Sequence, residues 1–281
     1  MQTKIILELG CNHNGSIDLS KKIIDDAVKL GVWGVKFQKR NPESMSQGEK
    51  LIPRDIKNSF GANYYEHRKA LEFSVDQIES LVNYAKAQGL AVGVSVFDMV
   101  SADQMAQLDI DFIKLPSQFY SHYALNRLLM DLGSISKINI FVSTGMHTLN
   151  EVIKWQYFNQ ANVTFYCRSI YPCQMDELDF RTMQELKAYL EDGCLGYSSH
   201  DVNGKAIGKA VLLGAQYIER HYTLDKNMKG SDHGTVSSDF AEMQQIINDI
   251  EQAEELLYAS NNLENLSSEK EKHVRMIYRG F

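Results

Sequence analysis

The stretch IERHYTLD (residues 218–225) has the β-branched and aromatic content of a strand, yet it carries Glu219, Arg220 and His221 side by side. A buried strand avoids charge unless the charge is paired or functional. A second histidine, His200, ends the preceding predicted strand, CLGYSSH. If the two strands are neighbours in a parallel sheet, about 4.8 Å apart, both imidazoles can share one cation and leave positions open for water and substrate. The spacing alone is equally compatible with two buried, hydrogen-bonded histidines.

Strand parity separates the three ionisable residues of this stretch. Glu219 and His221 share one face, because side chains two residues apart point the same way in a strand. If His221 binds a metal ion beside His200, Glu219 can orient an imidazole or a bound water from the same face. Arg220 points to the other face, where we predict a structural pair and no catalytic role.

Short apolar strands alternate with amphipathic helices along the whole chain. We predict strands at 4–10, 31–38, 90–97, 111–117, 138–145, 162–172, 194–200 and 218–225, each followed by a helix; the last two helices are near 204–214 and 238–258. The long segment from Lys39 to about Ser74 reads as polar. Eight βα units in about 250 residues favour a closed (β/α)₈ TIM barrel.

We therefore predict a single α/β domain over residues 1–258, with 259–281 as a linker or docking tail. The alternative fold is a doubly wound open sheet, which usually has fewer strands and a glycine-rich first turn. Here the first turn reads GCNHNGS, which does not match G-x-G-x-x-G and so gives no support for dinucleotide binding.

The carboxyl ends of barrel strands build the active site, and each predicted strand carries polar groups at that end. In strand order these are Glu8; Lys36 and Gln38; Ser95; Lys114 and Ser117; Ser143 and Thr144; Ser169 and Tyr171; Ser198 and His200; and Glu219 and His221. Any one of them alone is more often a cap or a solvated side chain. Eight strands converging on one rim indicate a site, and its two lysines suit a phosphate or a carboxylate.

The composition excludes several classes of protein. The 281 residues carry a net charge of −7 with a pI near 5.6, which argues against nucleic acid or an anionic membrane as the main partner. The four cysteines form no C-x-x-C pair and read as reduced thiols. The sequence shows neither a signal peptide nor an apolar run of about 20 residues, so we predict a soluble, cytoplasmic protein.

The chain resembles the catalytic barrel of the sialic acid synthases, the phosphoenolpyruvate-dependent N-acetylneuraminate synthase family. The matching stretches are ELGCNHNGSIDLSKKIIDDAVKLG, GVKFQ, STGM, IYP, GYSSHD, GAQYIERHYTLDKNMKGSDH and SSEKEKHVR. They spread from residue 8 to about 275. N-H-N-G combined with S-x-H and E-R-H-x-T-L-D is specific, whereas any one of these is weak. The family normally continues into a small antifreeze-like domain beyond the linker at which the matching ends.

The resemblance implies a divalent metal, Mn²⁺ or else Mg²⁺ or Co²⁺, held by His200 and His221. It implies that Tyr171 and Asp232 contact the sugar and that Glu8 lies near the reacting carbons. The residues it implies for phosphoenolpyruvate are Lys36, Gln38, Lys114, Ser117 and Ser143, with Ser95, Ser169 and Ser198 completing the pocket.

The implied reaction is a C–C bond-forming transfer in carbohydrate and polysaccharide biosynthesis. The metal polarises the open-chain aldehyde of an N-acylated aminosugar, and C3 of phosphoenolpyruvate attacks it. Water then adds at C2, and phosphate is released. The product is a 2-keto-3-deoxy acid. Glu8 is the candidate that orients or deprotonates this water. The family dimerises partly through its C-terminal domain, so a homodimer is a possible partner state.

Departures from the family pattern affect the acceptor side. Ser199 replaces an aspartate, Arg168 replaces a threonine, Gln118 stands where a small residue is common, and Val94 and Val96 flank Ser95 where S-T-P-F is usual. We interpret these changes as lying where the sugar is read. Arg168 is a candidate for the arginine that the antifreeze-like domain lends to a partner subunit, although parity turns it toward the helix layer.

The sequence leaves the acceptor open among N-acetylmannosamine, a 6-phosphate, a diamino sugar and an unaminated aldose. Two other functions stay in view. One is a sugar-phosphate aldolase or isomerase with Lys114 as a Schiff-base lysine, which leaves the histidine pair unexplained. The other is a catalytically idle barrel retained for binding. The remaining loop histidines, His13, His122 and His147, we assign to capping or surface roles, with His233 set apart.

Overall fold

The computed structural model describes residues 2–159, 161–190, 194–230, 232–234 and 236–258. Eight parallel strands run in sequence order, and β1 also pairs with β8, so the sheet closes. The strands are β1 (Lys4–Glu8), β2 (Gly34–Lys39), β3 (Ala91–Val96), β4 (Phe112–Leu115), β5 (Asn139–Ser143), β6 (Val163–Tyr166), β7 (Cys194–Ser199) and β8 (Tyr217–Tyr222). The predicted TIM barrel is confirmed. The predicted tail, 259–281, lies outside the described residues.

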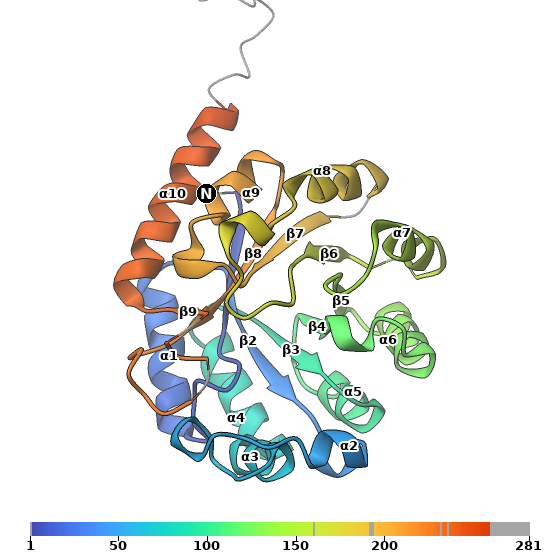
Figure 1. Cartoon of the computed structure of the whole chain (residues 1–281), viewed down its shortest axis with the longest axis vertical. Coiled ribbons are helices and arrows are strands. Elements are labelled where there is room, and N and C mark those ends of the chain that lie inside the picture. Colours follow the sequence, from blue (N-terminus) through green and yellow to red (C-terminus); the bar gives the residue numbers. More distant parts are fainter. Residues whose placement is uncertain (1, 160, 191–193, 231, 235, 259–281) are drawn as a thin grey trace, which may run out of the picture.

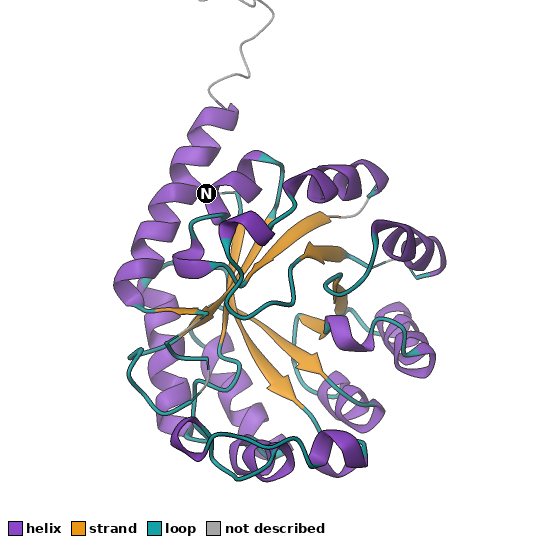
Figure 2. Ribbon diagram, viewed as in Figure 1, coloured by secondary structure: helices purple, strands orange, loops and turns teal. Residues whose placement is uncertain are grey.

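Helices form the outer ring (Figures 1 and 2). They are α1 (Ile17–Lys29), α2 (Gln47–Lys50), α3 (Tyr64–Leu71), α4 (Val75–Lys86), α5 (Met99–Ala106), α6 (Tyr123–Ile135), α7 (Leu149–Phe158), α8 (Phe180–Tyr189), α9 (Ile207–Leu212) and α10 (Phe240–Tyr258). Capping boxes at Ser46, Ser74 and Thr148 satisfy the first amides of α2, α4 and α7. None of the described helices is long and apolar enough to cross a membrane.

Shorter elements differ from the sequence-based prediction. β6 ends at Tyr166, well before residue 172, and a two-residue strand, β9 (Ser237–Ser238), adds to the end of β8. The polar segment after β2 contains α2 and α3. Short 3₁₀ turns lie at Pro42–Ser44, Ile56–Asn58, Ser117–Phe119, Met175–Glu177 and Val202–Gly204.

An aromatic plug fills the amino-terminal part of the barrel lumen. It is made of the buried side chains of Ile6, Phe112, Phe141, Val163 and Phe165. Gly93 and Gly196 make room for it, since a Cβ would lie 2.1 Å from the Phe112 ring and 2.6 Å from the Phe165 ring. Side chains alternate along a strand, so the next residues that face the lumen lie two positions further toward the carboxyl ends. Their side chains therefore point into the site.

The other face of each strand packs against the helices in one large apolar core. Val94 and Val96 are fully buried in it, so these two departures from the family pattern do not reach the lumen. The prediction that they lie where the sugar is read is wrong, because strand parity places them toward the helices.

Arg220 also faces outward and is fully buried. Its Nε donates to Ser238 Oγ at 3.0 Å, and Nη1 donates to Ser199 Oγ at 3.1 Å and to the Asp201 carbonyl at 2.7 Å. The side chain therefore joins β7, β8 and β9 on the helix side of the barrel. This is the structural role that parity predicts.

We expect the Arg220→Met variant to lower the free energy of unfolding by about 3 kcal/mol, because buried acceptors on β7 and β9 lose their donor. Denaturant unfolding followed by circular dichroism measures this change. Arg127→Met is the matched control, since Arg127 forms an exposed pair with Asp131 on α6, and it should stay within about 0.5 kcal/mol of the parent. Equal stability of Arg220→Met and the parent would contradict the assignment.

Candidate active site

A cavity of about 480 Å³ opens at the carboxyl ends of the strands. It is lined by fourteen of the residues predicted from the sequence: Glu8, Lys36, Gln38, Ser95, Lys114, Ser117, Ser143, Ser169, Tyr171, Ser198, His200, Glu219, His221 and Asp232. Thr144, which is also predicted at this rim, does not line the cavity, and its Oγ1 donates to the Phe165 carbonyl at 3.2 Å. A larger cavity of about 860 Å³ involves the opposite end of the strands, but none of its described lining residues is a lysine, arginine, histidine or carboxylate. The chemistry is therefore concentrated at the carboxyl-terminal mouth.

The floor of this cavity is a buried layer of two lysines and two carboxylates. Lys36 Nζ lies 2.6 Å from Glu8 Oε2 and 3.3 Å from Glu219 Oε2, and Lys114 Nζ lies 2.7 Å from Glu219 Oε1. All four residues are at most 3% exposed. Within the described residues, Glu8 Oε2 and Glu219 Oε2 have these ion pairs with Lys36 and no neutral hydrogen-bond donor. Each oxygen keeps a lone pair that can accept a hydrogen bond from a water or a substrate hydroxyl.

Burial and pairing act in opposite directions on the charges of this layer. Burial works against the ammonium of Lys36, but Glu219 and Glu8 outweigh it and raise the pKa of Lys36. For Lys114, burial together with repulsion from Lys36 exceeds the effect of Glu219, and the pKa is lowered. Burial opposes the charge of Glu219, yet Lys114 and Lys36 hold its pKa well below the usual range. Glu219 is therefore ionised at neutral pH.

Of the two roles predicted for Glu219, the orientation of an imidazole is not observed among the described residues, and the orientation of a bound water stays a prediction. Besides its contacts with the lysines, Glu219 accepts a hydrogen bond from Ser198 Oγ at 3.0 Å, so its bonds run to Lys114 and Ser198 and not to an imidazole. His200 is oriented by the main chain, because its Nδ1 lies 2.8 Å from the carbonyl oxygen of Arg168. Glu219 is thus an anchor for the lysine layer.

His200 and His221 lie together on the rim, with ring centroids 5.8 Å apart. Burial, and after it the proximity of His221, lowers the pKa of His200 to about 3, so the imidazole is neutral. Its Nδ1–H donates to the Arg168 carbonyl, which leaves the lone pair on Nε2. His221 Nδ1 is buried with no hydrogen-bond partner among the described residues, and Gly10 allows this close approach: a Cβ there would lie 3.1 Å from Nδ1.

These two imidazoles fit a divalent cation, because one is held neutral with a free lone pair and the other has an unpaired buried nitrogen. No group of three or more His, Cys, Asp or Glu side chains within the described chain could hold a metal. Substrate or water would have to supply the remaining ligands, as catalytic metal sites require.

The hydroxyl groups of Ser117, after β4, and Ser169, after β6, converge on Gly145 in the same cavity as the lysines. A Cβ on Gly145 would lie 2.2 Å from Ser169 Oγ and 2.9 Å from Ser117 Oγ, so the glycine leaves room for both hydroxyls. Tyr171 packs against His200 with ring centroids 4.2 Å apart. Hydroxyl donors next to buried ammonium groups form a binding surface for oxyanions.

The N-H-N-G motif connects the loop after β1 to the end of β8 and to His233 at the mouth of the cavity. Asn12 Nδ2 donates to the last carbonyl of β8 at 2.8 Å, and Asn14 Oδ1 lies 3.1 Å from His233 Nε2. His13 is buried and stacks on Phe73 with centroids 4.3 Å apart. The predicted surface role of His13 is therefore wrong, but its Nδ1 accepts a hydrogen bond from the Gly15 amide at 3.0 Å, which is a capping contact. His122 caps α6 as predicted.

The departures at Arg168 and Ser199 do not lie in the cavity. Arg168 is exposed and contributes only its carbonyl oxygen to the site, through His200. Ser199 Oγ donates to Asp201 Oδ1 at 2.6 Å in the outward-facing network of Arg220. Of the departures, Gln118 alone lines the cavity in the described part of the chain.

Sequence reasoning missed a set of cavity residues from the segment after β2. They are Arg40, Arg54, Tyr64, His67 and Arg68. The segment has no hydrophobic period that would place it, although three arginines between two predicted elements are a signal that a charge pattern can detect. Cys11, Phe97, Met146 and Cys167 complete the described lining along with Pro116 and Gln118.

A sequence model of the NeuB family matches residues 23–262. The chain is 32% identical over 258 residues to the N-acetylneuraminate-9-phosphate synthase of Mus musculus, which covers 90% of this chain and 70% of the mouse protein. It is 31% identical over 288 residues to the N,N'-diacetyllegionaminic acid synthase of Campylobacter jejuni, covering 98% of this chain and 83% of that protein.

Solved structures agree on the fold. The N-acetylneuraminic acid synthetase of Leptospira borgpetersenii in complex with citrate superposes with a TM-score of 0.82 at 21% identity, covering 100% of this chain and 92% of that one. The spore coat polysaccharide biosynthesis protein SpsE of Bacillus subtilis gives a TM-score of 0.75 at 25% identity, covering 95% and 72%.

Two buried histidines at the arginine-rich side make stability depend on pH. Burial first, and then the nearby arginines, lower the pKa of His13 to about 3 and that of His67 to about 4. Below pH 6.5 the unfolded chain takes up protons that the folded chain refuses, so the free energy of unfolding falls as pH falls toward 4.

Between pH 7 and pH 4, the free energy of unfolding should fall less in His67→Asn than in the parent, by up to about 3 kcal/mol. This difference corresponds to about 1.4 kcal/mol for each unit by which the pKa of His67 is lowered. Denaturant unfolding at both pH values measures the difference. His122→Asn is the control, because it makes the same substitution at a histidine that caps α6, and asparagine keeps that cap. Equal pH slopes for His67→Asn and the parent would contradict the buried neutral histidine.

Proposed function

Because the chain belongs to the NeuB family, we propose that it condenses phosphoenolpyruvate with the aldehyde of an N-acylated aminosugar. The products are a 2-keto-3-deoxy acid of the sialic type and phosphate. Relatives named as synthases of sialic, legionaminic and pseudaminic acids support this class of reaction. The observation that carries the proposal is the buried lysine–carboxylate layer directly below two histidines in one cavity.

Phosphoenolpyruvate carries a carboxylate and a phosphate, and we place it over Lys36 and Lys114. Lysine ammonium groups act as point charges toward such oxyanions, and the hydroxyls of Ser117 and Ser169 add neutral donors from the adjoining strands. Lys114 also lies over the Phe165 ring at 4.3 Å, which holds its ammonium in the lumen. The aromatic plug below keeps bulk water away from this layer.

We assign the metal to His200 and His221, with Mn²⁺ as the expected ion and Mg²⁺ or Co²⁺ as alternatives. A divalent cation bound there would act as a Lewis acid on the acceptor carbonyl. The chain prepares His200 for this role through the Arg168 carbonyl, which fixes the ring tautomer.

Glu8 is the residue that we place at the attacking water. It pairs in register with Lys36 on one side and with His221 on the other, so it stands between the two parts of the site. Gln38 Nε2 donates to Glu8 Oε1 at 2.9 Å, while Oε2 lies 2.6 Å from Lys36 Nζ and has no neutral hydrogen-bond donor within the described residues. A water held at Oε2 can transfer its proton to the carboxylate.

The bonds then balance. A bond forms between C3 of phosphoenolpyruvate and the aldehyde carbon, and the water oxygen adds to C2. The C2–O bond to phosphate breaks as the C2 hydroxyl becomes the ketone. The two protons of the water end on the new C4 hydroxyl and on the released phosphate, with Glu8 as the group that moves the first of them.

Phosphate release from phosphoenolpyruvate should require an aminosugar aldose and a divalent metal together. We expect a chelator to abolish release and Mn²⁺ to restore it, with a keto acid of the summed mass as product. A coupled phosphate assay and mass spectrometry measure both. Phosphate release without any aldose would contradict the condensation, and inactivation by borohydride with a sugar but no metal would favour a Schiff base on Lys114.

Glu8→Gln should lower kcat by about 10²- to 10⁴-fold, because the neutral amide cannot accept the proton of the water. Tm should fall, because the neutral amide leaves the buried ammonium of Lys36 with one carboxylate fewer, so kcat is compared at a temperature at which the variant is fully folded. Glu185→Gln is the control, because Glu185 forms only a surface pair with Arg181 on α8. Retention of parental kcat in Glu8→Gln would remove Glu8 from the mechanism.

A further inference from the structure

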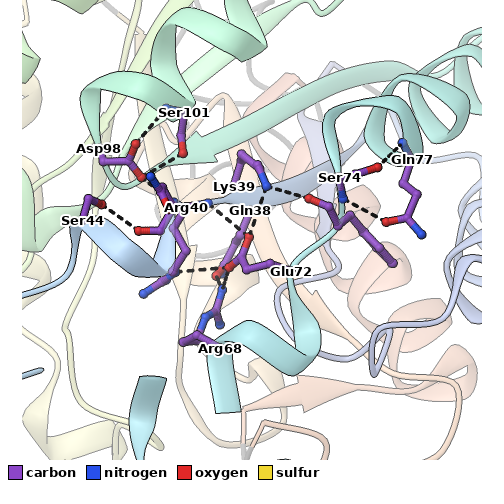
Figure 3. Close-up of polar contacts among 12 residues, drawn as sticks. Gln38, Lys39, Arg40, Ser44, Arg68, Glu72, Ser74, Gln77, Asp98 and Ser101 are labelled. Atoms are coloured by element: carbon purple, nitrogen blue, oxygen red, sulfur yellow. Dashed lines mark hydrogen bonds and ion pairs between the residues drawn. The ribbon is translucent and has the colours of Figure 1, made fainter. Parts of the chain in front are cut away.

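A cluster of cations lies at the mouth of the cavity, around the single carboxylate of Glu72. Figure 3 shows Lys39, Arg40 and Arg68 converging on this residue. Arg68 Nη2 lies 2.9 Å, Arg40 Nε 3.5 Å and Lys39 Nζ 3.9 Å from a Glu72 oxygen. Arg40 and Arg68 are 6% and 4% exposed, and both line the cavity. Two arginines at the cavity wall thus share one counterion with a lysine behind them.

The charges of this cluster do not balance. Three cations against one carboxylate leave a formal surplus of two positive charges. Arg54 and Asp232, which also line the cavity, add one charge of each sign and leave the surplus unchanged. Cys11 adds no anion, because burial raises the pKa of its thiol. Buried charge without a counterion is costly, so the folded chain carries the cost of an unmatched positive site here.

The guanidinium groups are also held in place by their neighbours. Arg40 stacks on the Phe97 ring at 3.7 Å and donates to Tyr64 Oη at 2.9 Å. Arg68 donates to Cys11 Sγ at 2.6 Å and to Glu72 Oε1 at 2.9 Å. A planar guanidinium positioned in this way at a cavity wall is suited to bind a phosphate or carboxylate.

The cluster lies beyond the lysine layer along β2. Lys36 is in the layer, Gln38 is the next lumen residue, and Arg68 Nη2 lies 3.5 Å from Gln38 Oε1. The charges of the inner lysines are matched by Glu8 and Glu219, whereas the surplus is at the mouth. A second ligand that enters after phosphoenolpyruvate therefore contacts the surplus positive charge with the end that lies at the cavity mouth.

We propose that Arg40 and Arg68 bind a phosphate ester on the acceptor sugar, at the end remote from its aldehyde. This inference rests on the proposed function, because it assigns the inner lysines to phosphoenolpyruvate. A phosphate monoester carries close to two negative charges at neutral pH and matches the surplus, whereas a carboxylate would neutralise half of it. The acceptor class is then an N-acylated aminosugar 6-phosphate.

The test compares N-acetylmannosamine with its 6-phosphate as acceptors at saturating phosphoenolpyruvate and Mn²⁺. We expect the parent protein to prefer the phosphorylated sugar in kcat/KM. Arg40→Gln and Arg68→Gln should each lower the ratio of the two kcat/KM values by about 10- to 100-fold, the effect of losing a charge-assisted hydrogen bond. Arg40→Lys should fall between, since it keeps the charge and loses the planar fork. The exposed Arg127→Gln is the matched control and should leave the ratio unchanged.

A binding measurement without turnover separates this inference from the proposed function. We expect N-acetylmannosamine 6-phosphate to raise Tm of the metal-free protein more than N-acetylmannosamine does, and Arg40→Gln or Arg68→Gln to remove the difference. An unchanged kcat/KM ratio in both variants, or an increase in the KM for phosphoenolpyruvate alone, would overturn the inference. Failure of every acceptor to release phosphate, with the Tm difference intact, would overturn the reaction and leave the arginine subsite standing.

Discussion

The site depends on the ion pairs that the carboxylate of Glu219 makes with two lysines. The carboxylate projects from β8 into the lumen and meets Lys36 from β2 and Lys114 from β4, so it couples strands that share no hydrogen bonds. Removing one partner from such a buried set leaves an uncompensated charge, which is why the layer is complete and balanced. The aromatic plug below and the serine hydroxyls around it follow from the same need to exclude water while satisfying each charge.

The residues of the inner site could be predicted from the sequence because two simple rules were enough to place them. Alternation along each strand told which residues face the lumen, and parallel strands bring their carboxyl ends to one rim. Those rules place Glu8 beside His221 and Lys36 without any knowledge of contacts. Parity also assigned Arg220 to the outside, where the structure finds it hydrogen-bonded to β7 and β9.

The rest could not be predicted because it depends on tertiary contacts of loops. The segment after β2 has no repeat that tells which side chains turn inward, so the convergence of Arg40 and Arg68 on Glu72 emerges only when α3 is docked. His13 resembled a loop residue until Phe73, from a distant turn, was found to cover it. Ser199 looked like a change in sugar recognition, but one residue of register places it behind the barrel wall.

The aromatic plug closes the lumen at its amino-terminal end. Phe112, Phe141 and Phe165 are nearly fully buried and close the path toward the amino-terminal face, so ligands reach the lysine layer and leave it through one mouth. A molecule held at Arg40 and Arg68 then stands in the way of one held at Lys36 and Lys114. With phosphoenolpyruvate at the lysines and the acceptor at the arginines, as proposed above, the inner ligand would enter first and leave last.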